Sequence, residues 1–180
     1  MRYSAEHTET IRAKIVENAS RAFRKTGIEG VSIPALMKKV GLTHGGFYSH
    51  FDDRDDLVSE AIKHASLETG SSVFAETAEL GAALDRYLSP EHVAHPDHGC
   101  VIAALGADAP RQKASVRKAF AAAGLGLVRL VQRKLGAKLS MEPTDEALAL
   151  TSQMIGAVIL ARVVDDPKLA ARILRVAKRA

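Results

Sequence analysis

The stretch THGGFYSH, residues 43–50, places imidazole and hydroxyl groups around two glycines that have no side chain. The imidazole of His44, neutral or charged, can donate a hydrogen bond to an acceptor on a purine edge, and the Thr43 hydroxyl can reach a phosphate. Gly45 and Gly46 each cost roughly 1 kcal/mol as helix formers. That cost makes sense where a backbone must approach a duplex closely, so the stretch favours nucleic-acid recognition.

Two short helices joined by a turn are predicted to position these groups, over residues 31–51. Ser32 and Thr43 are good N-caps, because their hydroxyls accept hydrogen bonds from free amides of the first helical turn. Gly41 suits the end of the first helix, since glycine takes positive φ at low cost. Apolar contacts would hold the helices at a steep angle through Leu36, Val40, Leu42 and Phe47. This construction predicts a helix-turn-helix.

The run GLTHGGFYSHF, followed by DDRDDL, resembles the DNA-binding arm of the TetR family (TetR/AcrR type) of bacterial transcriptional regulators. The matching positions, in order, are Gly41, Thr43, His44, Gly45, Tyr48, His50 and Phe51. The resemblance implies a DNA-binding domain over residues 8–68 and a C-terminal effector-binding and dimerisation domain over residues 73–180.

The same resemblance implies roles for four further side chains. Tyr48 and His50 would contact phosphates, although packing by Tyr48 and backbone capping by His50 are the alternatives. Arg54 falls where the family usually has a lysine that contacts phosphate, and Ser32 would reach the DNA backbone, although capping alone explains a serine there. Phe47 and Phe51 are expected to pack inside the arm, and Asp52 should weaken affinity for DNA.

Composition excludes several classes of protein. The 180 residues are 47% hydrophobic and 4% aromatic, which favours packed helices. No run of eighteen uncharged apolar residues appears, and residues 1–14 lack the apolar stretch of a signal peptide. One cysteine cannot form an internal disulfide, so we expect a cytoplasmic protein with no membrane contact. Residues 1–60 carry nine basic and nine acidic side chains, so the expected DNA arm is neutral.

Helical periodicity continues along the chain, and no strand pattern is found. We expect an all-α fold, with a three-helix DNA-binding arm and a helical ligand-binding and dimerisation body. The expected helices cover residues 8–25, the two helix-turn-helix elements, 54–72, 76–88, 100–109, 112–135, 145–164 and 167–178. Residues 145–164 are apolar almost all round, so we expect one face inside the body and another against a second subunit. Burial at the centre of the body is the alternative, whereas the resemblance favours a homodimer.

Three histidines and the cysteine form a second group with possible chemistry: His92, His95, His98 and Cys100. These are zinc-ligand types, but their spacing matches no common zinc module, so we predict no metal site, no cofactor and a solvated loop. Neighbouring histidines and a helix N-terminus would lower the pKa of the Cys100 thiol and make it an electrophile or oxidant sensor. A buried, inert thiol is the alternative.

These observations predict a homodimeric, ligand-responsive repressor that binds an inverted-repeat operator in double-stranded DNA and is released by a small-molecule, electrophile or oxidant signal. A helical adaptor that no longer binds DNA is the first alternative, supported by the acidic stretch 52–56 and the neutral arm. A metal-dependent enzyme that uses the histidine loop is the second. It would need a general base and an open coordination site, so we predict no enzymatic activity.

Overall fold

The computed structural model describes residues 5–136 and 142–179. Residues 1–4 of the N-terminal segment, and 137–141 and 180 of the expected C-terminal domain, lie outside the described residues. Every regular element of the described residues is helical, which confirms the all-α prediction. The α-helices are α1 (Ala5–Thr26), α2 (Ile33–Lys39), α3 (Arg54–Ser72), α4 (Leu80–Tyr87), α5 (Pro90–Ala94), α6 (Val101–Leu105), α7 (Ala114–Lys134), α8 (Asp145–Val163) and α9 (Pro167–Ala177). The 3-10 helices are η1 (His44–Ser49), η2 (Pro96–His98) and η3 (Gly106–Arg111).

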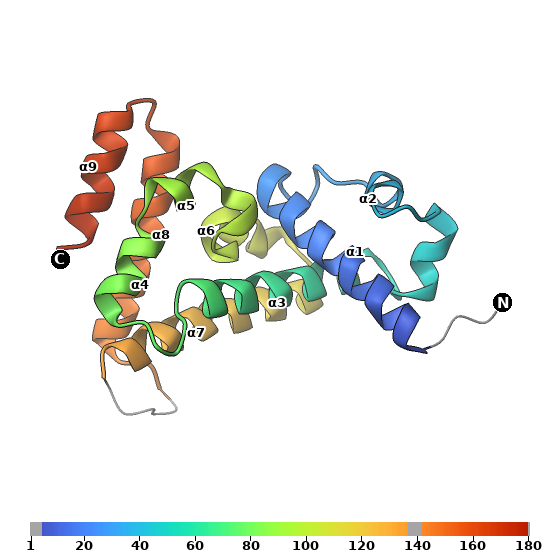
Figure 1. The fold of residues 1–180 in the computed structure, drawn as a ribbon, viewed down its shortest axis with the longest axis horizontal. Helices are drawn as coiled ribbons and strands as arrows, with labels where there is room; N and C mark the ends of the chain where they lie inside the picture. Colours follow the sequence, from blue (N-terminus) through green and yellow to red (C-terminus); the bar gives the residue numbers. More distant parts are fainter. Residues whose placement is uncertain (1–4, 137–141, 180) are drawn as a thin grey trace.

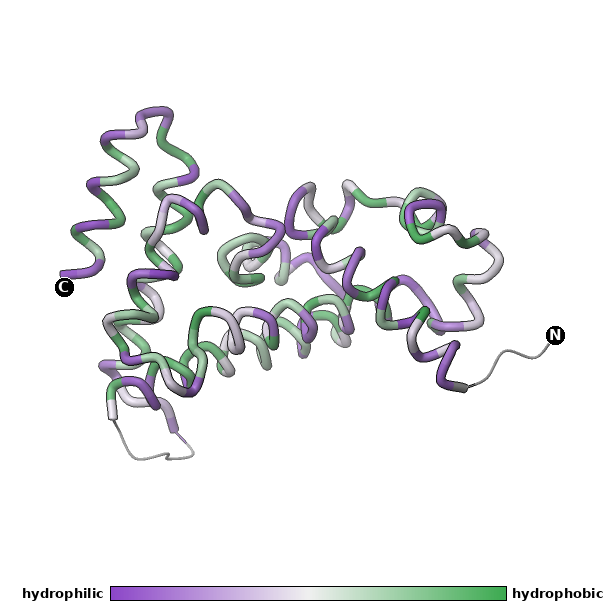
Figure 2. The backbone as a smooth tube through the Cα atoms, in the orientation of Figure 1, coloured by the Kyte–Doolittle hydropathy of each residue, from purple (hydrophilic) through white to green (hydrophobic). Residues whose placement is uncertain are grey.

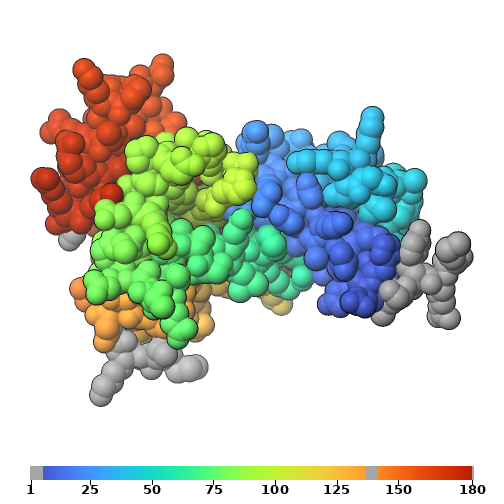
Figure 3. Space-filling model, in the orientation of Figure 1, coloured from blue at the N-terminus to red at the C-terminus, as the bar shows by residue number. Residues whose placement is uncertain are grey.

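The molecule is elongated, with the N-terminal helices at one end and the C-terminal helices at the other (Figure 1). The long helices α3 and α7 pack along each other and connect the two ends. In the space-filling view, the arm formed by α1, α2 and η1 makes up the end opposite to α8 and α9 (Figure 3). The arm is therefore presented far from the C-terminal helices.

Two clusters of buried apolar side chains form the core. The first joins the arm to the body, because Phe23 of α1 and Phe47 of η1 belong to the same cluster as Leu105 of α6 and Phe120 of α7. The second lies within the body and includes Tyr87, Met154 and Leu174. The boundary expected between residues 68 and 73 falls in the last turn of α3, after Ala65, the last α3 side chain in the first cluster.

Helix α8 buries only one of its apolar faces. Its buried side chains recur at helical spacing, with Ala147, Met154 and Val158 in the core, whereas Leu160 is 56% exposed and Val163 is 74% exposed. Among the described residues, α8 is the one helix long and apolar enough to cross a membrane by length and composition, a test that core helices of soluble proteins also pass. Hydrophobic positions recur along both α8 and α9 at this end of the molecule (Figure 2).

The structure corrects the sequence prediction in the segment with the histidines. Residues 89–98 are not a solvated loop, because they form α5 and η2 and bury His92. Ser89 starts α5 by accepting a hydrogen bond from the His92 amide. The expected helix 76–88 begins only at Leu80, and the expected helix 100–109 divides into α6 and η3.

Candidate nucleic-acid interface

The turn between α2 and η1 has the geometry predicted for a helix-turn-helix. The Ser32 hydroxyl accepts a hydrogen bond from the Ala35 amide at 3.3 Å and so caps α2. Gly41 takes φ +78° and donates to the Lys38 carbonyl at 3.1 Å, while Leu42 donates to the Met37 carbonyl at 2.9 Å. This pair of bonds is a Schellman motif, which ends one helix and redirects the chain.

One side of η1 is anchored in the core of the arm. Phe47 is 1% exposed and stacks on Phe51 with ring centroids 5.4 Å apart, so the predicted packing of both rings is confirmed. Thr43 caps the element, because its hydroxyl accepts from the Gly46 amide at 3.3 Å. The second element of the motif is a 3-10 helix, a tighter form that is common in short pieces.

The other side of η1 is bare. His44 and Gly45 are exposed, and Tyr48 is 67% exposed with its ring edge-on to Phe47. A Cβ added at Gly45 would meet no heavy atom within 4 Å, and at Gly46 the nearest atoms would be Thr43 Oγ1 at 3.7 Å and Met37 Cε at 3.9 Å. Neither glycine is required by packing within the chain, so the open backbone is available to an outside surface.

His50 lies at the edge of this surface and is partly tied to α1. Its carbonyl accepts a hydrogen bond from Arg12 Nε at 3.3 Å, and the Arg12 guanidinium lies 4.8 Å from the centroid of the Phe51 ring. Burial first, and then the nearby Arg12 charge, lower the pKa of His50, so both disfavour the protonated ring. Its buried Nδ1 has no hydrogen-bond partner among the described residues. Sequence reasoning missed Arg12, since the contact spans thirty-eight positions.

Arg54 points partly inward. Its Nη2 donates to the Ile28 carbonyl at 2.6 Å, and its guanidinium lies 5.8 Å from the centroid of the Phe23 ring. The arginine therefore fixes the turn after α1 to the start of α3. Asp53 caps α3, because its Oδ1 accepts from the Asp56 amide at 2.8 Å.

The histidine segment does not surround the Cys100 thiol with positive charge. His92 Nδ1 lies 2.6 Å from the Tyr87 carbonyl, and His92 Nε2 accepts from the Cys100 amide at 2.9 Å. Accepting at Nε2 requires a neutral ring, and burial lowers the pKa of His92 accordingly. Cys100 is 3% exposed. No three His, Cys, Asp or Glu side chains of the described residues are grouped so as to hold a metal ion.

A capped helix-turn-helix with one bare polar side, on an arm of an all-helical chain, is the arrangement typical of the helix-turn-helix class of DNA-binding proteins. Residues 15–61 match the family described as bacterial regulatory proteins, tetR family. The probable HTH-type transcriptional regulator ArpR of Pseudomonas putida is 34% identical over 85 residues, which cover 47% of this chain and 40% of ArpR. The chain therefore spans less than half the length of this curated relative.

Solved structures share the whole fold. The reduced form of NemR from E. coli has a TM-score of 0.74 at 17% identity and is covered over 94% of both chains. A TetR-family regulator from Agrobacterium tumefaciens has a TM-score of 0.73 at 18% identity, over 96% of this chain and 97% of that one. The family match over residues 15–61 and the similarity to ArpR support a transcriptional regulator of the TetR family.

Proposed function

We propose that this chain represses transcription by binding an inverted-repeat operator as a homodimer, with η1 of each subunit in a major groove. The observation that supports this most directly is the bare, glycine-containing side of η1, which packing within the chain does not explain. An operator read by two identical arms must have the twofold symmetry of the dimer. The protein works in the cytoplasm, where the DNA is.

Each exposed group of the arm has a role in this proposal. His44 donates to a purine edge, and the Thr43 hydroxyl reaches a phosphate in addition to capping η1. Gly45 and Gly46 let the backbone approach the duplex. Contacts to the DNA backbone come from Tyr48, His50, Ser32 and Arg54. Since Arg54 Nη2 is engaged by the Ile28 carbonyl, Arg54 would offer its remaining N–H groups to phosphate.

The dimer interface is proposed on the exposed apolar face of α8 and α9. A cleft of about 450 Å³ runs between these helices and is lined mainly by apolar side chains, including Leu160, Leu169 and Val176. Gly156 lies in this cleft, and an added Cβ there would meet no heavy atom within 4 Å. A second subunit could therefore approach α8 closely and cover its apolar side chains.

A signal received by the body would release the DNA. A small molecule acts only through different affinities for the DNA-competent and DNA-incompetent arrangements of the two arms. The aromatic side chains of the expected effector region, Phe74, Tyr87 and Phe120, are buried in the two core clusters. Cys100, next to Tyr87, is the site proposed for an electrophile or oxidant signal, which would have to open the core to reach a thiol that is 3% exposed.

Binding to promoter DNA, followed by fluorescence anisotropy at several salt concentrations, tests the proposal. We expect affinity to fall with rising salt, because phosphate contacts release counterions. His44→Ala should reduce discrimination between operator and scrambled duplex by about tenfold or more. His95→Ala, which changes an exposed histidine of the body, should have no effect. Wild-type protein with no salt-dependent binding would favour the adaptor, and unchanged discrimination in His44→Ala would refute the role of His44.

A further inference from the structure

Arg24 of α1 is a buried charge at the junction of arm and body. Its side chain has no exposed surface, and the guanidinium makes three hydrogen bonds. Nε donates to the Ser20 carbonyl at 3.2 Å in its own helix, Nη1 to the Gly99 carbonyl at 2.6 Å, and Nη2 to Glu68 Oε2 at 2.5 Å. One side chain of the arm therefore holds both α3 and the segment before α6.

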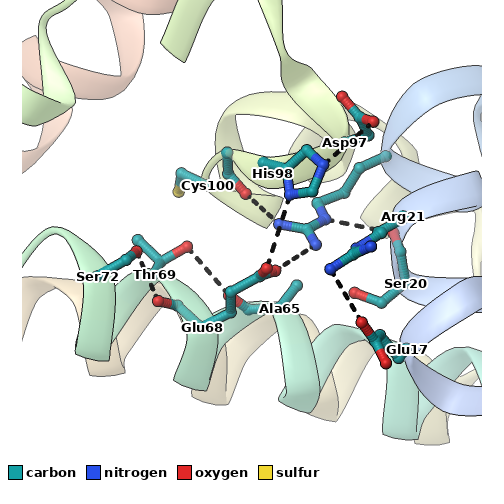
Figure 4. A network of polar contacts seen from close by, with 12 residues as sticks. Glu17, Ser20, Arg21, Ala65, Glu68, Thr69, Ser72, Asp97, His98 and Cys100 are labelled. Atoms are coloured by element: carbon teal, nitrogen blue, oxygen red, sulfur yellow. Dashed lines mark hydrogen bonds and ion pairs between the residues drawn. The ribbon is translucent and has the colours of Figure 1, made fainter. Parts of the chain in front are cut away.

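The carboxylate that pairs with Arg24 has a second neighbour. Figure 4 shows Glu68 projecting from α3 toward His98, with dashed lines that also join His98 to Asp97. The nitrogen of His98 lies 3.9 Å from Glu68 Oε1. Glu68 is partly exposed, so it can remain charged beside Arg24, and the charge of the buried guanidinium is compensated.

The carbonyl that accepts from Arg24 belongs to a residue with little freedom to move. A Cβ at Gly99 would lie 2.4 Å from the His92 ring, so this position admits only glycine next to that ring. The ring is itself fixed at both nitrogens, by the Tyr87 carbonyl and the Cys100 amide. The segment from α5 to α6 is thus a rigid block against which Arg24 is held.

Arg162, in the last turn of α8, holds the same block from the other side. Its Nε donates to the Val93 carbonyl at 3.2 Å, Nη1 to the Ala103 carbonyl at 3.2 Å, and Nη2 to the His92 carbonyl at 2.7 Å. These carbonyls lie on α5 and α6. The helix proposed to form the dimer interface is therefore joined to α1 of the arm through two arginines and one rigid segment.

We infer that Arg24 and Arg162 are positioning residues for DNA binding: together they fix the angle of the arm relative to α8, and thereby the separation of the two recognition elements in the dimer. This inference rests on the proposed function. Packing already holds α3 along α7. Arg24 adds hydrogen bonds and an ion pair that join α1 to the body. A planar guanidinium can bind three acceptors at once, and lysine lacks this fork geometry.

A distance measurement within one subunit tests the inference without DNA. Spin labels at Lys14→Cys on α1 and Ala82→Cys on α4, both exposed, report the arm-to-body distance of the full chain diluted with unlabelled protein. We expect a narrow distribution in the parent protein and one about twofold wider in Arg24→Lys and in Arg162→Lys. Arg21→Lys is the matched control, because Arg21 is on the same helix, is 42% exposed and forms its ion pair with Glu17 of that helix.

An unchanged distribution in folded Arg24→Lys and Arg162→Lys would overturn the inference. If Arg24→Lys fails to fold, the result for Arg162→Lys decides alone, because the Arg162 side chain is only half-buried.

A second measurement compares operators whose half-sites are moved apart by one base pair at a time. In the variants, the ratio of affinities for the natural spacing and for the altered spacings should fall about tenfold. Their affinity for a single half-site should equal that of the wild type. Loss of half-site binding as well would indicate a merely structural role and overturn the inference; failure of the wild-type chain to bind DNA would count against the proposed function only.

Discussion

Gly45→Ala adds one methyl group to the bare side of η1. Within the chain this methyl group has no neighbour, since no heavy atom lies within 4 Å of an ideal Cβ at this position. The glycine does not have a positive φ, so alanine fits its backbone without strain. We therefore expect the free energy of unfolding to rise by about 0.4–1 kcal/mol, because alanine restricts the unfolded chain.

The same methyl group should weaken DNA binding. If η1 lies in a major groove with its backbone close to the bases, the added Cβ occupies the space between them and displaces His44. Loss of one base contact costs about 1–3 kcal/mol, which corresponds to about a 5- to 150-fold increase in Kd. Stability and affinity would then change in opposite directions, which an ordinary folding defect cannot produce.

Urea unfolding and fluorescence anisotropy on the operator measure the two effects. Gly81→Ala is the matched control, because an added Cβ at Gly81 on α4 also meets nothing within 4 Å and lies in the body. The control should gain stability and retain affinity. A Gly45→Ala protein that is folded and binds the operator as tightly as wild type would refute the close approach of η1 to DNA.

Three further outcomes are expected. Leu160→Glu, at a position 56% exposed in the cleft of α8 and α9, should leave a folded monomer in sedimentation velocity; a persistent dimer would contradict the proposed interface. Gly99→Ala should lower the free energy of unfolding by about 1–3 kcal/mol, because its Cβ would overlap the His92 ring, and unchanged urea midpoints would count against a rigid block. Burial lowers the pKa values of His92 and His50 below 6.5, so the unfolded chain binds more protons and stability should fall as pH decreases below about 6.5. His92→Gln should reduce this pH dependence in urea unfolding at pH 5.5 and 7.5, values chosen about one unit on either side of the ordinary histidine pKa. If the variant and the parent protein show the same pH dependence, groups other than His92 cause it.

Local signals in the sequence were sufficient for the helix-turn-helix. The caps at Ser32 and Thr43 and the left-handed Gly41 depend on hydrogen bonds between residues three to five positions apart. Such bonds follow from residue type and spacing, and all three positions were predicted correctly. The all-α fold and the apolar character of α8 were predictable for the same reason, since helical periodicity is a local property.

Contacts between distant residues could not be predicted. His92 was expected in a solvated loop, but its ring binds the Cys100 amide eight positions away and packs against Tyr87. Arg24 reaches Gly99 across seventy-five positions, and nothing in the local pattern of α1 distinguishes it from Arg21, whose side chain is 42% exposed. The 3-10 form of η1 was also missed, because periodicity in a six-residue element does not separate it from an α-helix.

Selection of bound sequences from a pool of random duplexes, with the full-length protein, tests the central claim most directly. The proposed dimer with one bare η1 in each subunit predicts enrichment of an inverted repeat whose two half-sites lie about one helical turn apart or a multiple of it. His44→Ala should lose the enriched bases within each half-site. A pool without an enriched motif, or one that converges on a single half-site without a symmetric partner, would contradict the claim.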